Sequence, residues 1–303
     1  MTTSSASATS NGSAAPAPVP PGVLDAPLPP AMAAKASDLG VSKAGLDTTR
    51  TFVLAVLAGA FIALGAMFAT VVTAGAGDVP FGLARLAAGV VFSLGLLLVV
   101  AAGAELFTGN NLIVMAWADR RVTVGRVARN WAIVYLGNMV GAVATALLVY
   151  AAGQYEFGDG AVGLNALAIA DTKASLGWGQ AVALGVLCNA LVCLAVWLSY
   201  SARSLTDKFF AVLLPISAFV AAGFEHSIAN MYFLPLGLFV KSGADEAFWH
   251  TTGAGVGDYP NLTWSAAAFD NVAPVTLGNI FGGAVMVGLV YWLVYRRPTH
   301  TSA

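Results

Sequence analysis

Long apolar runs without Asp, Glu, Lys, Arg or His dominate this chain of 303 residues. Four such runs cover residues 51–77, 130–155, 174–202 and 271–295. A helix of about 20 apolar residues crosses a hydrocarbon core of about 30 Å, so each run is long enough to span a bilayer. The pattern therefore predicts four plain membrane-spanning helices.

Two further apolar segments, residues 86–118 and 209–240, are too long for one straight span. Each would measure about 50 Å as a helix with a rise of about 1.5 Å per residue. Both have a polar interruption near the middle, with Gly, Glu and Asn at the same offsets. These residues are Gly103, Glu105 and Asn110 in the first segment, and Gly223, Glu225 and Asn230 in the second. We predict an all-α integral membrane protein with six transmembrane helices, of which the second and fifth are interrupted.

The two halves of the chain repeat one another. Residues 136–141 read LGNMVG and residues 277–282 read LGNIFG, at corresponding places after the two interruptions. Because each half holds three spans, the copies must insert with opposite orientations, which gives 3+3 inverted repeats. Such repeats with paired interrupted helices are typical of transport proteins, with the substrate path at the repeat interface. The alternative is a chance similarity between helices rich in Gly and Ala.

Composition argues against several other classes of protein. Only 10% of the residues are charged and 58% are hydrophobic, whereas roughly 25% are charged in soluble domains. The net charge of −1 provides no basic surface for nucleic acid. Metalloprotease, serine-hydrolase and Cys-rich motifs are absent from the sequence, so we expect no enzyme, no metal and no cofactor. Cys188 and Cys193 share one apolar run and are expected to be buried hydrophobic residues.

Basic residues gather on one side of the predicted membrane. Of the 14 Lys and Arg, all but Arg85, Lys173 and Lys241 lie before span one, between spans two and three, between spans four and five, or after span six. Short cytoplasmic loops are enriched in Lys and Arg. Both termini are therefore predicted to be cytoplasmic, in a multi-pass protein of the cytoplasmic membrane.

The regions outside the spans differ in composition. Residues 1–30 are mostly Ala, Ser, Thr, Pro and Gly, which is typical of a disordered tail. Residues 31–50 mix apolar positions with charges, as in an amphipathic helix at the membrane surface. The channel domain is predicted over residues 51–297, and a C-terminal tail over residues 298–303.

His226 is the leading functional candidate, because it follows Glu225 at the second interruption, deep in an apolar segment. Its charge can change between about pH 5 and 8, so it can gate a pore, attract an anion or exchange a proton. The alternative is a neutral imidazole that caps exposed backbone. For Glu105 and Glu225 we expect structural roles, since a carboxylate can satisfy free amides at a helix start. Half-helices that begin at such breaks direct their positive ends inward, which favours an anion.

Three polar residues are further candidates along a path. Thr108 lies in the first interruption, where its hydroxyl either replaces part of an anion's hydration shell or caps a helix. Lys173 precedes span four, either as a charge that concentrates anions at a pore mouth or as a solvated loop lysine. Asn189 lies within span four and either donates to a passing anion or joins two helices.

Five blocks of sequence resemble the formate/nitrite transporter family: AELFT at 104–108, YLGNMVGA at 135–142, VCLAVWLSYS at 192–201, GFEHSIANM at 223–231 and PVTLGN at 274–279. The resemblance runs from about residue 30 to residue 297. It implies an aquaporin-like arrangement and a homopentamer in which each protomer has its own pore, without a cofactor. It also implies passage of formate or a similar small monovalent anion, with nitrite, hydrosulfide and short carboxylates as alternatives.

The resemblance assigns roles to individual residues. It implies that residues 106–108 form a mobile loop that faces His226, and that Asn189 and Lys173 line the path. From the repeated breaks themselves we expect structural roles for Glu105, Glu225, Asn110 and Asn230. Apolar constrictions are implied at Phe92, Leu96, Leu106, Phe219 and Val192. The chain departs from the family pattern at Glu105, where formate channels carry a shorter aspartate, and at residues 109–111.

A proton step follows as a hypothesis. Protonated formate is a neutral acid, so His226 as proton donor would make one pore a passive anion channel at higher pH and a proton-coupled exporter at lower pH. Two other classes are weighed against this. One is an aquaporin-type pore, whose paired Asn-Pro-Ala loops the sequence lacks, and the other is a purely structural membrane protein.

Overall fold

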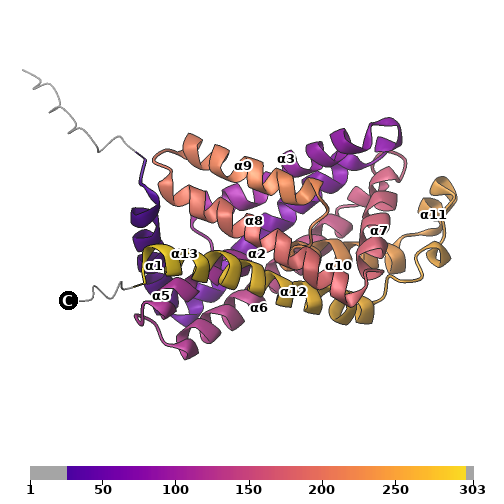
Figure 1. The fold of residues 1–303 in the computed structure, drawn as a ribbon. Helices are drawn as coiled ribbons and strands as arrows, with labels where there is room; N and C mark the ends of the chain where they lie inside the picture. The colour runs from indigo at the N-terminus through magenta and orange to yellow at the C-terminus, as the bar shows by residue number, and fades with distance from the viewer. Residues whose placement is uncertain (1–25, 298–303) are drawn as a thin grey trace, which may run out of the picture.

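The computed structural model describes residues 26–297, and every regular element within them is a helix (Figure 1). The predicted tails over residues 1–30 and 298–303 lie outside the described residues, apart from residues 26–30. The α-helices are α1 (Pro29–Gly45), α2 (Thr48–Thr73), α3 (Phe81–Ala102), α4 (Phe107–Asn110), α5 (Val114–Ala118), α6 (Val124–Ala151), α7 (Ala161–Ala174), α8 (Trp178–Ser201), α9 (Leu205–Ala221), α10 (Ser227–Gly243), α11 (Glu246–Thr252), α12 (Ala273–Ile280) and α13 (Val290–Tyr295). Short 3-10 turns cover Ala76–Asp78, Asn111–Ile113, Gln154–Glu156 and Val256–Asp258.

Five helices in the described part of the chain are long and apolar enough to cross a membrane. They are α2, α3, α6, α8 and the rod Ala266–Tyr295, in which π-helical segments Ala266–Val272 and Phe281–Leu289 alternate with α12 and α13. Helices α9 and α10 have 17 residues each. The chain is thus an integral membrane protein. Helices α2 and α6 begin a few residues before their apolar runs, because Asp47 and Thr123 cap their first turns.

The chain leaves the helical conformation at both polar motifs. Helix α3 ends at Ala102, Gly103 adopts φ 75°, and helical structure resumes at Phe107. In the second half, α9 ends at Ala221, Gly223 adopts φ 76°, and α10 begins at Ser227. Only glycine takes this left-handed conformation without steric cost, so the shared glycine lets the chain turn out of each helix at the same offset.

The same helix crossing holds each half together. Helix α6 packs on α2, and α12 packs on α8. A Cβ atom on Gly141 would collide with the Val56 carbonyl, and one on Gly282 with the Val186 carbonyl. These glycines allow the backbones to touch, as small residues do at helix crossings in membranes.

Helix α1 is more deeply packed than a surface helix. The residues predicted as one amphipathic helix, 31–50, divide between α1 and the start of α2, with Asp47 capping the second helix. Met32, Ala33 and Ala36 are buried. In Figure 1, α1 lies at one end of the molecule with α5 and α13, while α7 and α11 lie at the other end. Helices α1 and α7 correspond in the two halves, because Lys43 on α1 and Lys173 on α7 form equivalent ion pairs with Glu105 and Glu225.

Candidate functional site

The two helix breaks meet at a contact between His226 and Thr108. His226 Nε2 lies 3.0 Å from Thr108 Oγ1, and both residues are buried. The Ala229 backbone N–H donates to His226 Nδ1 at 3.1 Å, which makes this nitrogen an acceptor. A neutral imidazole has one donor and one acceptor nitrogen. The proton of the neutral ring is therefore on Nε2, where it donates to the Thr108 hydroxyl oxygen.

An ion pair between a buried carboxylate and a partly exposed lysine flanks each break. Lys173 Nζ lies 2.7 Å from Glu225 Oε1, and Lys43 Nζ lies 2.7 Å from Glu105 Oε1. The glutamate side chains are 6% and 5% exposed, and those of the lysines 15% and 28%. Lys173 is thus neither a solvated loop lysine nor a bare charge. Lys43, which the sequence suggested only as part of a surface helix, holds the equivalent position in the other half.

Asparagine side chains complete each carboxylate environment. Asn110 donates to Glu105 at 2.6 Å, and Asn230 donates to Glu225 at 2.6 Å. A second pair from the following spans joins them: Asn130 accepts from Asn110, and Asn271 accepts from Asn230. Asn130 and Asn271 also donate to the backbone carbonyls of Lys43 and Lys173, respectively. The network therefore ties each lysine, glutamate and helix break into one unit.

The expectation that the glutamates cap the helix starts is wrong. The Phe107 backbone N–H donates to Asn138 Oδ1, and the Ser227 backbone N–H donates to Asn279 Oδ1, each at 2.9 Å. The side-chain amide nitrogens of Asn138 and Asn279 donate to the backbone carbonyls of Glu105 and Glu225 at 2.9 and 3.0 Å, respectively. An asparagine side chain offers both donor and acceptor, so it can hold both ends of the break, which a carboxylate cannot.

Apolar side chains surround the central contact. The Phe92 and Phe219 rings meet edge to face with centroids 5.6 Å apart, and Phe219 stacks on His226 at 6.0 Å. Leu106 directly precedes α4, as His226 directly precedes α10. The five predicted constriction residues, which we term the apolar ring, are each 3% exposed or less: Phe92, Leu96, Leu106, Val192 and Phe219.

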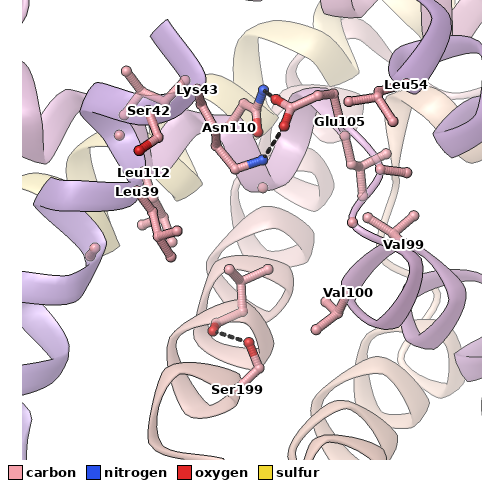
Figure 2. A pocket seen from close by; sticks show the side chains of 18 of the residues that line it. Leu39, Ser42, Lys43, Leu54, Val99, Val100, Glu105, Asn110, Leu112 and Ser199 are labelled. Carbon is pink, nitrogen blue, oxygen red and sulfur yellow. Dashed lines mark hydrogen bonds and ion pairs between the residues drawn. The ribbon is translucent and has the colours of Figure 1, made fainter. Parts of the chain in front are cut away.

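A cavity of about 380 Å³ lies between α1, the end of α3, the first break and α8. Leu96 and Leu106 are among its lining residues. Lys43 and Glu105 also line it and form an ion pair there (Figure 2). Val99 and Val100 from the end of α3, Leu39 and Ser42 from α1, and Ser199 from α8 also line it. The cavity is thus bordered by the ion pair of one break and by two of the predicted constriction residues.

The family model for formate/nitrite transporters matches residues 30–293. The chain belongs to this family. The formate channel FocA of Escherichia coli K12 is 48% identical over 274 residues, which cover 90% of this chain and 96% of FocA. A probable formate transporter of Methanothermobacter thermautotrophicus is 41% identical over 287 residues, which cover 88% of this chain and 97% of that protein.

Two solved structures are similar to this formate/nitrite transporter. A pentameric formate channel with formate bound matches with a TM-score of 0.79 and 46% identity, covering 82% of this chain and 97% of the other. A channel described as an FNT family ion channel matches with a TM-score of 0.72 and 29% identity, covering 87% and 98% of the two chains.

Asn189 is occupied by protein contacts in this family member. Its amide nitrogen lies 3.3 Å from the Thr108 carbonyl, 3.0 Å from Asn111 Oδ1 and 2.7 Å from the Asn279 carbonyl. A primary amide has two N–H groups, so three acceptors already compete for them. This geometry favours the second role weighed for Asn189, that of joining helices around the first break.

Several residues of the network were missed by sequence reasoning. The repeated LGN motif already contained Asn138 and Asn279, but it served only as evidence of a repeat. No local pattern marked Lys43, because its partner Glu105 lies 62 residues away.

Within residues 26–297, no three His, Cys, Asp or Glu side chains gather as a metal site.

Proposed function

We propose that this protein is a formate channel of the cytoplasmic membrane. The His226–Thr108 contact carries the proposal, because it joins the two breaks beside an apolar ring and places one proton donor at their meeting point. The 48% identity to a formate channel and the similarity to a formate-bound structure support formate as the substrate. Both relatives match over at least four fifths of this chain.

The proposed architecture has six spans in two inverted halves, arranged as in aquaporins. Helix α3 with α4 and α5 forms the interrupted second span, and α9 with α10 forms the fifth. Support comes from hydrogen bonds that recur in both halves. For example, the Asn138 and Asn279 side-chain amides donate to the backbone carbonyls of Glu105 and Glu225, respectively. We further propose a homopentamer, as in the pentameric relative, with both termini cytoplasmic and the cavity beside Lys43 open to that side.

The proposed path runs through the cavity, the apolar ring and the central histidine. The constriction is formed by Phe92, Leu96, Leu106, Val192 and Phe219 and excludes water. It blocks ions whose lost hydration is not replaced by contacts with the protein. Helix α10 begins at Ser227 with His226 as its N-cap, so the positive end of the helix favours an anion beside His226. The lysine of each ion pair draws the anion in, while its glutamate holds the lysine in place.

Proton transfer from His226 Nε2 is the proposed chemical step. The Nε2 proton points to Thr108, and an anion that displaces the hydroxyl accepts this hydrogen bond instead. At low pH the ring first takes a second proton on Nδ1, which then releases the Ala229 N–H. The imidazolium gives its Nε2 proton to formate, which leaves a neutral imidazole and neutral formic acid. The neutral acid crosses an apolar ring more easily than an anion. The channel then couples proton and formate movement at low pH and conducts the anion at higher pH.

The His226→Phe variant tests this step in proteoliposomes. We expect wild-type formate flux to change with pH, and the variant to lose that dependence. The matched control is Thr108→Val, which removes the hydroxyl but keeps the imidazole and its titration. An identical pH profile in His226→Phe and wild type would show that His226 does not couple proton to formate. Swelling assays with formate, nitrite and glycerol would separate a formate pore from a nitrite or aquaporin-type pore.

A further inference from the structure

A second hollow, of about 580 Å³, lies outside the proposed path, between α8, α9, α13 and the start of α1. Apart from the Trp197 and Tyr291 rings and the Ser201 hydroxyl, its lining side chains are aliphatic or thioether groups. They are Pro27, Pro29, Met32, Leu191, Leu194, Leu198, Leu214, Pro215 and Ala218. The Ser201 hydroxyl donates to the Pro27 carbonyl at 2.9 Å, so its proton is already used. The chemistry of the hollow suits hydrocarbon.

The hollow opens outward and has the depth of one membrane leaflet. Leu214 is 72% exposed and Leu198 45%, so both face the surroundings rather than the core. Along α8 the lining runs from Leu191 to Ser201, which is about 15 Å at about 1.5 Å per residue. This is about half of a hydrocarbon core of about 30 Å. The Trp197 and Tyr291 rings stack at 4.1 Å and give the hollow a rigid wall.

A cation stands at the end of the hollow. The exposed Lys35 ammonium donates to the Tyr200 carbonyl at 3.0 Å, next to Ser201 and one helical turn from Met32. An ammonium group has three N–H donors, and the contacts within residues 26–297 use one of them. The nearest acid on the same helix, Asp38, pairs with Arg121 at 2.6 Å. Lys35 therefore has donors left for an anionic group just outside the apolar lining.

We propose that this hollow binds an anionic phospholipid, with one acyl chain along α8 and α9 and the phosphate on Lys35. The length of the lining matches an acyl chain in one leaflet, and the position of Lys35 matches a headgroup. A second copy of the chain is the competing occupant, and it would not need the lysine charge.

Native mass spectrometry of the intact oligomer tests the proposal. The probe is an equimolar mixture of phosphatidylglycerol and phosphatidylcholine with identical acyl chains. A charge-assisted contact of about 1.4 kcal/mol gives about a tenfold preference, so we expect wild type to retain phosphatidylglycerol about tenfold better. Lys35→Gln is expected to bring the preference close to one, while Arg126→Gln, an exposed cation on α6, leaves it unchanged.

The Ala218→Trp variant fills the hollow from an exposed position on α9. We expect it to lose most retained lipid of both kinds and to keep the oligomeric mass of wild type. Three outcomes would overturn the proposal: no preference in wild type, a preference that survives Lys35→Gln, or a loss of the oligomer in Ala218→Trp. The last result would assign the hollow to a contact between subunits.

Discussion

At the scale of single residues, the two halves are alike around the breaks and different at their meeting point. Leu106 and His226 occupy corresponding positions, each directly before a helix start. One half thus contributes an apolar side chain and the other a proton donor. Because the surrounding Lys, Glu and Asn contacts recur in both halves, we attribute the chemistry of the path to this one difference.

The Lys173–Glu225 ion pair is expected to matter for both stability and flux. Lys173→Met leaves the Glu225 carboxylate buried without its cation, which costs about 3–5 kcal/mol and places an uncompensated negative charge beside the path. The double variant Lys173→Met/Glu225→Gln removes both charges and should recover most of that stability. SDS titration of unfolding measures the cost. A single variant as stable as wild type would contradict the buried-pair argument.

Lys43→Met provides the matched comparison in the other half. Its side chain is 28% exposed, whereas that of Lys173 is 15% exposed. Water can therefore reach the Glu105 carboxylate more easily after the change, so we expect a smaller loss of stability, by about half. Equal losses in both variants would show that burial does not set the difference.

The residues at the breaks could be predicted only in part. The repeated Gly, Glu and Asn positions located both breaks, because the same backbone conformation requires the same residue types at the same offsets. Their partners could not be found this way. Asn271 and Lys173 are 98 residues apart and Asn138 and Glu105 are 33 apart, and only the fold brings such distant groups together.

At the scale of helices, close backbone contact depends on glycine. Gly141→Ala places a methyl group against the Val56 carbonyl and forces α6 away from α2. We expect a loss of about 1–3 kcal/mol, the usual cost of overpacking. Gly125→Ala is the control on the same helix, since a Cβ there meets nothing within 4 Å. If both variants unfold at the same SDS fraction, the crossing does not require glycine.

Hydropathy predicted the last membrane span but not its π-helical segments. The apolar run over residues 271–295 contains the π-helical segment Phe281–Leu289, and a second π-helical segment precedes α12. Apolar composition fixes that a segment crosses the membrane, whereas the choice between i→i+4 and i→i+5 bonding depends on neighbours. Here Asn189 donates to the Asn279 carbonyl at 2.7 Å, a contact that no periodicity in the last span could indicate.

At the scale of the whole molecule, Asp119 links the two ends of the described chain. It accepts from Ser37 on α1 and from Trp292 and Arg296 near the end of the last helix. Burial raises the pKa of Asp119, but hydrogen bonds from these three residues outweigh it and hold the pKa below its ordinary value of 3.8. A depressed carboxylate pKa stabilises the fold above the unfolded value, and this stabilisation is lost as pH falls through the folded value.

The Asp119→Asn variant should therefore differ from wild type in a pH-dependent way. At pH 7 we expect the variant to be less stable by about 1–2 kcal/mol, because charged hydrogen bonds become neutral ones. The gap between the two unfolding temperatures should shrink as pH falls below 3.8. A gap that stays constant down to pH 2.5 would show that the carboxylate charge is not what holds α1 to the last helix.

Every residue of the proposed path comes from one chain, so in an oligomer each protomer should conduct on its own. Val100 lines the cavity, and Val100→Cys places a reactive thiol there, while the native Cys188 and Cys193 are buried. Mixed oligomers of wild-type and Val100→Cys subunits can then be blocked with a bulky methanethiosulfonate reagent. We expect the remaining formate flux to equal the wild-type fraction at every ratio, because a blocked pore leaves its neighbours open. A pore shared by all subunits would instead lose almost all flux at a half share of blocked subunits, and such a curve would rule out a path through the His226–Thr108 contact.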